Sequence, residues 1–174
     1  NKSGLGVTLN NHITVNGTLS LTSGKITTNA STLIIGSSGS VTANATNYVV
    51  GNLQKAFPIS VGIPQSVTYT IGDATNYTPI DITIASVSAA GTIIAKTTAG
   101  EHANIDTSRI NASKDVNRSW MLTPAGGIAF TTYDATFNFV TGDVDSGAVP
   151  SNFIVKRYQS LAPIGWNSTT TGIQ

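Results

Sequence analysis

We expect an all-β fold in which a short β-helical or strand-stack N-terminal part packs on an antiparallel β-sandwich. Short apolar runs alternate with Gly, Asn, Ser and Thr over residues 7–50, and nothing there repeats at the helical period. After residue 64 the apolar runs lengthen and alternate, as in a sheet that buries one face. We therefore predict two domains: a short-runged, solenoid-like β-stack over residues 1–56 and an antiparallel sandwich over residues 57–174.

Each apolar run of the first part is a candidate rung of the stack. The runs are short, rich in β-branched residues, and closed by turn formers such as Asn10-Asn11, Asn16-Gly17 or Gly36-Ser37-Ser38-Gly39. β-Branched residues and Gly both lower helix propensity, so no helix of ordinary length fits here. The expected rungs lie at residues 7–9, 13–15, 19–21, 26, 33–35, 41 and 48–50.

Two prolines, Pro58 and Pro64, mark the joint between the parts, at residues 55–64. Proline cannot donate to a strand ladder, so two in seven residues cannot both serve a central strand. The segment 100–117 gathers charged residues, and we expect a long crossing loop there with at most one short helical turn. Seven sandwich strands are expected at residues 67–71, 80–87, 92–97, 120–123, 128–130, 135–140 and 153–158.

The composition favours an extracellular protein. Only 10% of residues are charged, against about 25% in typical soluble domains, so Ser, Thr, Asn and Gly must wet the surface. A net charge of +1 offers no basic field, so we expect no nucleic-acid partner. The absence of cysteine excludes disulfides and thiolate metal sites, and no run approaches the ~20 apolar residues of a membrane span. Because the chain starts without Met or a signal-like segment, we expect a piece of a longer secreted precursor.

A series of short motifs runs through nearly the whole chain. They are residues 19–28 (LSLTSGKITT), 33–35 (LII), 48–53 (YVVGNL), 69–72 (YTIG), 77–80 (YTPI) and 117–123 (NRSWMLT). In this order they resemble a β-rich, adhesin-like module of large surface proteins that bacteria export by the type IX secretion route. Thr70 departs from that pattern, which usually has proline there. The resemblance implies a non-catalytic structural or adhesive module and names no ligand.

Residues that could carry chemistry are few. The stretch Asp143-Val144-Asp145-Ser146-Gly147 resembles half of a calcium loop, which makes Asp143 and Asp145 weak calcium candidates. No further acidic residue follows them, so an ordinary Gly/Asp turn is the preferred interpretation. The two histidines, His12 and His102, lie far apart and lack the spacing of a zinc site or a nucleophile motif. We expect no catalytic residues, no cofactor site and no enzymatic activity, with structural calcium as the one metal alternative.

The two tryptophans suggest different roles. Trp120 is flanked by Met121 and Leu122 in an expected core strand, so we predict that it fills the sandwich core. Trp166 stands near the chain end, where an exposed ring could stack on a sugar. Trp166 and its neighbour Asn167 are the candidate glycan contacts.

These observations predict a non-enzymatic structural and adhesive module of a secreted bacterial cell-surface protein or fibre. It would act by rigid spacing and weak multivalent contact with neighbouring modules, copies of itself or surface glycans. Two alternatives remain. The chain could be a self-assembling filament subunit that exchanges strands between copies, or a carbohydrate-binding module that uses Trp166.

Overall fold

The computed structural model describes residues 6–172 and is all-β, with 49% of residues in strands and 5% in helix. The predicted fold class is thereby confirmed. The chain forms two compact units, the first comprising residues up to Thr98 with Trp120–Phe139, and the second Ala99–Ser119 with the residues from Val140 onward. The predicted boundary at residue 56 lies inside the first unit, and the division into two domains at that residue stays a prediction.

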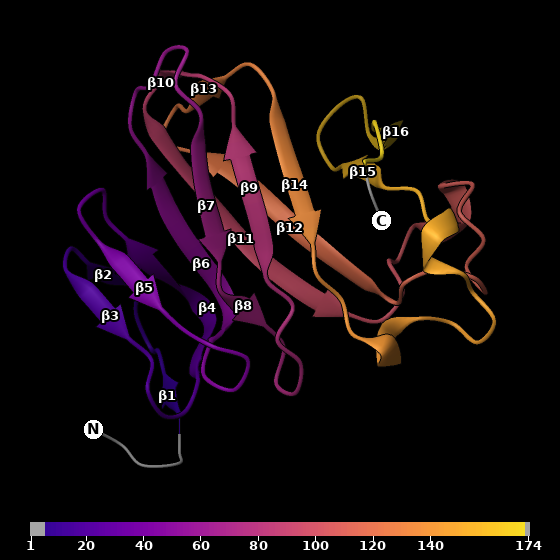
Figure 1. Cartoon of the computed structure of the whole chain (residues 1–174), viewed down its shortest axis with the longest axis horizontal. Coiled ribbons are helices and arrows are strands. Elements are labelled where there is room, and N and C mark those ends of the chain that lie inside the picture. Colours follow the sequence, from indigo (N-terminus) through magenta and orange to yellow (C-terminus); the bar gives the residue numbers. More distant parts are fainter. Residues whose placement is uncertain (1–5, 173–174) are drawn as a thin grey trace. The chain divides into compact units, whose positions relative to one another are not determined.

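The first unit begins with a β-solenoid-like stack of about three turns, in which successive coils pair in parallel (Figure 1). Strand β4 pairs with β1 and β2, β5 pairs with β3, β6 pairs with β4, and β8 pairs with β6. The strands of the stack are β1 (Val7–Thr8), β2 (Ile13–Val15), β3 (Thr18–Ser20), β4 (Ile26–Ile35), β5 (Ser40–Thr42), β6 (Val49–Phe57) and β8 (Ile71–Gly72).

The register explains why these residues form a stack. Ile13, Leu33 and Leu53 lie twenty residues apart and stand in one column, so each coil places an apolar side chain over the last. At the corner between the two ladders of β4, the buried Thr28 hydroxyl accepts a hydrogen bond from the Asn52 amide at 2.7 Å. The corner also requires Gly51, whose φ is +109° and whose missing Cβ would overlap that hydroxyl.

Strand β6 joins the stack to the rest of the first unit. Its other edge pairs antiparallel with β11 (Gly91–Ala99), from Gly91 opposite Phe57 to Ala95 opposite Leu53. Strand β12 (Arg118–Ala125) follows, which gives the order β1-β4-β6-β11-β12. The sheet thus changes from parallel to antiparallel at β6.

A three-stranded antiparallel sheet covers β6, β11 and β12 (Figure 1). Its order is β14 (Tyr133–Phe137), β9 (Ile80–Ile84) and β7 (Gln65–Tyr69), and the short strands β10 (Val87–Ala89) and β13 (Ala129–Phe130) pair with each other. The strand expected at 80–87 is therefore two strands, β9 and β10. The end of the strand expected at 67–71 is β8, which belongs to the parallel stack.

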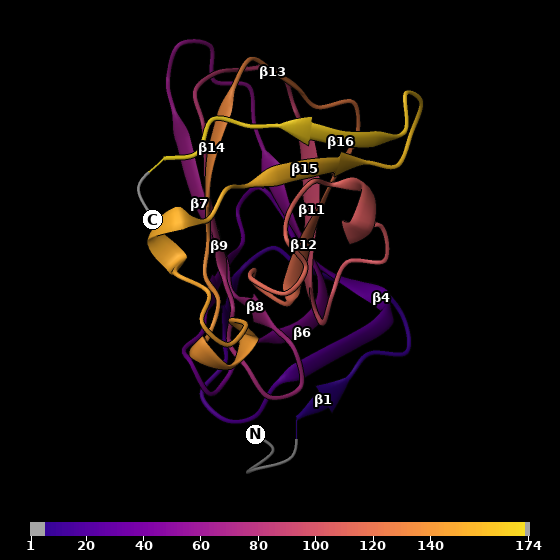
Figure 2. The same ribbon diagram turned by 90° about the vertical axis from the view of Figure 1, so that its right-hand side faces the viewer.

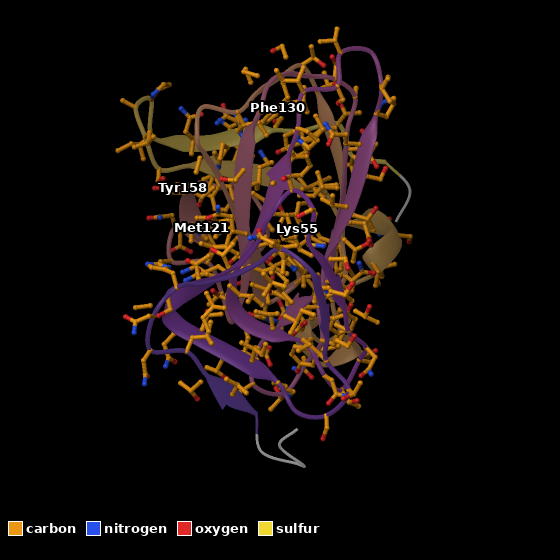
Figure 3. The ribbon with its side chains drawn as sticks, turned by 90° about the vertical axis from the view of Figure 1, so that its left-hand side faces the viewer. Lys55, Met121, Phe130 and Tyr158 are labelled. Atoms are coloured by element: carbon orange, nitrogen blue, oxygen red, sulfur yellow. The ribbon has the colours of Figure 1, made fainter. Side chains whose placement is uncertain are left out.

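One apolar core runs through the first unit. Alternation along β9 buries Ile80, Ile82 and Ile84, and the Tyr69 hydroxyl within this core donates to the Ile93 carbonyl at 2.9 Å. Burial raises the pKa of Tyr69. It also lowers the pKa of Lys55, which is labelled on β6 in Figure 3.

The second unit consists mostly of loops. It holds the 3-10 turns η1 (Ile105–Thr107), η2 (Thr141–Asp143) and η3 (Pro150–Asn152), and an antiparallel hairpin of β15 (Lys156–Gln159) and β16 (Gly165–Ser168) (Figure 2). The loop expected over residues 100–117, with one short helical turn, is confirmed by η1. Strand β16 was not expected. No helix among residues 6–172 has the length and apolarity needed to cross a membrane.

Candidate functional site

Three aromatic rings meet around Trp166 in the second unit. The ring centroid of Trp166 lies 4.9 Å from that of His102 and 5.1 Å from that of Tyr158, and His102 and Tyr158 are 5.0 Å apart. The indole N–H donates to the Asn104 carbonyl at 2.9 Å. Aromatic pairs at such distances contribute about 0.5–1.5 kcal/mol beyond burial, so the Trp166 ring is firmly oriented.

The hairpin determines which side chains accompany Trp166. Tyr158 pairs with Trp166, and Lys156 pairs with Ser168. Because alternate side chains of a strand face one side, these four residues share a face. Asn167 is expected on the opposite face, opposite Arg157 in the register. The pairing therefore puts Ser168 beside Trp166 in place of the predicted neighbour Asn167.

A shallow cleft of about 280 Å³ opens beside the indole of Trp166. Two cationic side chains and three hydroxyls line it with the indole, and no carboxylate is among the lining residues. The η1 loop and the hairpin both contribute lining residues. The lining residues are Thr107, Ser108, Arg109, Lys156, Trp166 and Ser168.

A larger open groove of about 580 Å³ lies in the first unit, at a corner of the solenoid-like stack. Small residues such as Gly24 and Ala74 form much of its lining. Lys25 is the cation there, but its ammonium donates to the Ala74 carbonyl at 2.6 Å and lies 4.5 Å from the Tyr48 ring centroid. The Lys25 ammonium is thus held against the groove wall, and no carboxylate is among the lining residues.

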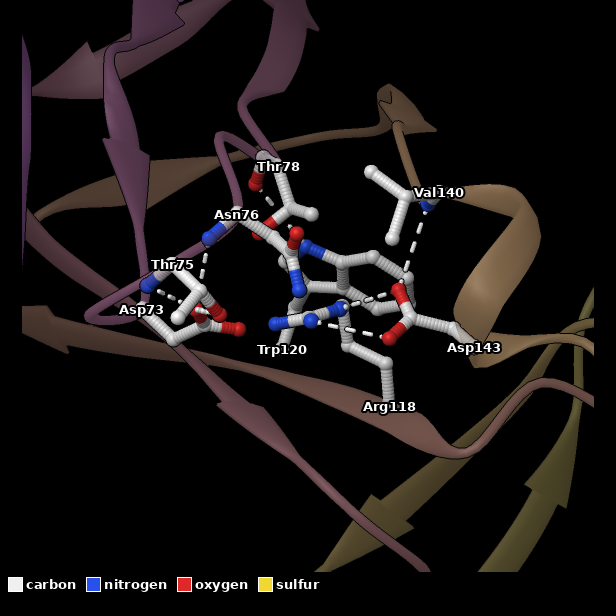
Figure 4. Close-up of polar contacts among 8 residues, drawn as sticks. All are labelled: Asp73, Thr75, Asn76, Thr78, Arg118, Trp120, Val140 and Asp143. Atoms are coloured by element: carbon white, nitrogen blue, oxygen red, sulfur yellow. Dashed lines mark hydrogen bonds and ion pairs between the residues drawn. The ribbon is translucent and has the colours of Figure 1, made fainter. Parts of the chain in front are cut away.

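Of the two calcium candidates, Asp143 forms a buried ion pair. Its Oδ2 and Oδ1 accept from Nε and Nη2 of Arg118 at 2.7 and 2.9 Å, and both residues are 6% exposed (Figure 4). The Val140 amide also donates to Oδ2, at 3.2 Å. A calcium ion bound to Asp143 would have to displace Arg118.

Asp145 is also occupied. Its carboxylate accepts from the Asn117 amide group at 2.7 Å and from the Asp115 backbone N–H at 3.1 Å. Within residues 6–172 no three His, Cys, Asp or Glu side chains form a group able to hold a metal ion. Hydrogen-bond donors of the protein thus already occupy the carboxylates that a calcium loop would use, and calcium binding stays an untested alternative.

Glu101, Asp115 and Asp145 form a cluster of carboxyl groups in the second unit. Burial raises the pKa of Asp115, and the charge of Asp145 raises it further. Burial and the charge of Asp115 likewise raise the pKa of Glu101. The cluster is therefore a local source of charge repulsion at neutral pH.

Trp120 lies in the first unit and is partly buried, at the side of the core rather than inside it. It packs against the core beside Phe137, at 5.2 Å between ring centroids, and its indole N–H donates to the Thr78 carbonyl at 3.2 Å (Figure 4).

The sequence pointed to Trp166, with Tyr158 among several aromatic residues of a possible platform, but not to the other residues around it, namely His102, Arg109, Lys156 and Ser168. The alternation Lys156-Arg157-Tyr158-Gln159 is the one local signal that could have placed Lys156 and Tyr158 on a common face. Comparison with known proteins gives no further guidance, since no family model, curated protein or solved structure matches the chain.

Proposed function

We propose that the chain is a non-enzymatic structural and adhesive module of a secreted bacterial cell-surface protein. The observation that carries the proposal is the double pairing of β6, parallel to β4 and antiparallel to β11. Because one strand belongs to both ladders, the solenoid coils cannot shift against the following sheets without breaking hydrogen bonds. A unit of this kind holds a fixed length, which is what a spacer requires.

The surface of the stack supports an extracellular location. Hydroxyls and amides link successive coils: Ser40 Oγ donates to Thr18 Oγ1 at 3.2 Å, and Ser38 Oγ donates to the Asn16 carbonyl at 2.9 Å. Such neutral polar groups keep the surface hydrated although it carries few charges, as in secreted β-proteins. The motif resemblance to modules exported by the type IX route also favours this location, with neighbouring modules or copies as partners.

The open edge of the first coil favours a filament subunit as a second candidate. Among residues 6–172, β1, β2 and β3 each pair on one side only, with the next coil. An unpaired strand edge can accept a strand from another chain. The same edge serves the spacer if a preceding segment of a longer protein continues the stack.

The test is the mass and length of one, two and three copies joined in tandem, measured by light scattering after size exclusion and by small-angle X-ray scattering. For a spacer, the single copy stays at its monomer mass of 17.9 kDa and the maximum dimension rises linearly with copy number. Copies that collapse on one another, so that size grows only as a compact globule does, would contradict the spacer.

Polymers of the single copy would instead support the filament. The matched variant is Thr14→Lys, which puts a charge on an exposed position of the open edge. If strand exchange at this edge builds the polymers, Thr14→Lys abolishes them. The control is Thr83→Lys, the same substitution at a half-buried position on the interior strand of the three-stranded sheet, and it should leave the polymers intact.

A further inference from the structure

We propose that the cleft between the β15–β16 hairpin and the η1 loop binds an acidic saccharide, a sugar that carries a carboxylate. In this arrangement the Trp166 indole contacts the sugar ring, and Arg109 and Lys156 contact the carboxylate. The inference relies on the proposed function only for its biological role, as the adhesive contact of the module.

The aromatic surface is preorganised. Trp166 lines the cleft while its N–H is held by the Asn104 carbonyl and its ring is contacted by those of His102 and Tyr158. A ring fixed in this way loses little entropy when a ligand binds, so more of the contact energy appears as affinity. The part of the indole that borders the cleft is small, so it would contact one edge of a pyranose while the polar lining meets the rest.

The charge of the cleft selects an acid. Within residues 6–172 neither Arg109 nor Lys156 forms an ion pair with a carboxylate. No acidic residue is among the residues that line the cleft. A guanidinium binds a carboxylate through two parallel hydrogen bonds, and an ammonium adds a point charge. Two cations that line one cleft therefore favour an anionic ligand over a neutral sugar.

The backbone at Arg109 is constrained in a way that suits a binding residue. Its φ is +65°, a left-handed conformation uncommon for residues other than glycine. The turn is held by the buried Ser108, whose hydroxyl accepts from the Ile110 amide at 2.8 Å. Such conformations persist where the surroundings enforce them and gather at ligand sites.

Size and polarity limit the ligand further. The cleft volume of about 280 Å³ lies just below the usual range of ligand pockets, which suits one sugar unit of a chain that continues into solvent. The hydroxyls of Thr107 and Ser168 can meet sugar hydroxyls. A bare phosphate would use the cations but leave the indole without a partner.

The experiment is a titration followed by two-dimensional ¹H–¹⁵N NMR, with trigalacturonate as the acidic probe. Its fully methyl-esterified form is the neutral match, and inorganic phosphate tests for a general anion site. We expect saturable chemical-shift changes at the Trp166 indole N–H and the Ser168 amide, with a dissociation constant in the millimolar range. The ester and phosphate should bind at least about tenfold more weakly.

Three substitutions of equal charge change locate the site. Arg109→Gln and Lys156→Gln should each weaken trigalacturonate binding about tenfold. Arg157→Gln removes a cation from the residue next to Lys156, on the other face of the hairpin, and should change binding by no more than about twofold. Dispersed spectra of each variant confirm that it is folded.

The proposal is overturned by any of four results: no saturable shift, equal binding of the ester, equal binding of phosphate, or an equal loss in Arg157→Gln. None of these would change the length of tandem copies in solution. Failure of the binding site and failure of the spacer are therefore distinguishable.

Discussion

Replacing Arg118 with methionine should destabilise the second unit by about 3–5 kcal/mol, the range found when one partner of a buried ion pair is removed. The pair consists of two hydrogen bonds at 2.7 and 2.9 Å between residues that are each 6% exposed. After the substitution, the buried Asp143 carboxylate keeps the Val140 N–H but loses its counter-charge. The cost thus comes from an uncompensated charge rather than from the lost volume, since methionine is of similar length.

The double variant Arg118→Met, Asp143→Leu tests that reasoning. It removes both charges, so most of the loss should be recovered, even though each change alone is destabilising. A residual cost of about 1 kcal/mol is expected, because the Val140 N–H loses its acceptor. Arg157→Gln, at an exposed position, is the control and should change stability by less than about 0.5 kcal/mol.

The assay is native-state hydrogen exchange of the amides that the pair holds in place. The Asn117 amide donates to the Asp143 carbonyl at 2.7 Å, and the Val144 amide donates to the Thr141 carbonyl at 3.2 Å. A loss of 3 kcal/mol or more should accelerate exchange at these amides by at least about a hundredfold. Acceleration below about fivefold, or a double variant no more stable than Arg118→Met, would refute the argument.

Four further outcomes are expected. Leu53→Ala, at a fully buried position of the stack, should cost about 2–5 kcal/mol in urea unfolding. Gly51→Ala should cost about 1–3 kcal/mol, because its φ is positive and a Cβ would overlap the Thr28 hydroxyl, whereas Gly17→Ala, with open space around it, should be neutral. The pKa of Asp115 is raised on folding, so the native state binds more protons and stability should fall as pH rises from 3.8 through the raised value. Asp115→Asn should flatten this dependence and raise the melting temperature at pH 7. Millimolar calcium, compared with chelator, should leave the melting temperature unchanged. A clear rise would support the hypothesis of a calcium loop at Asp143 and Asp145.

The rungs of the stack could be predicted because their signal is local. Each apolar run is followed by a turn former, and the column of Ile13, Leu33 and Leu53 repeats evenly in the sequence. The sequence does not show that β4 continues from Ile26 to Ile35, because Thr28 to Ser31 read as a turn. These polar residues stay in the strand because the next coil bonds them: the Asn52 side-chain amide donates to the Ser31 carbonyl at 2.9 Å.

The candidate site was predictable only in part, because its signal is not local. Trp166 is conspicuous in the sequence, but Gly165-Trp166-Asn167-Ser168 lacks the β-branched alternation that indicates a strand. Without β16, neither the face shared with Lys156 nor the opposite placement of Asn167 could be derived. Arg109 reaches the cleft through the η1 loop, almost sixty residues earlier, and no local pattern links the two segments.

The length of the open edge of the first coil helps to decide between the spacer and the filament subunit. Aggregation through strand edges needs a long, flat row of unpaired N–H and C=O groups. Here β1, β2 and β3 have only two or three residues each, and turns divide them. Such an edge offers few hydrogen bonds to an incoming strand at any one place, so another copy would gain little from pairing. A coil covalently linked to the stack pays far less entropy to make the same bonds, since it is already held close by. The geometry of this edge therefore favours a stack continued by a linked segment over one that recruits free copies.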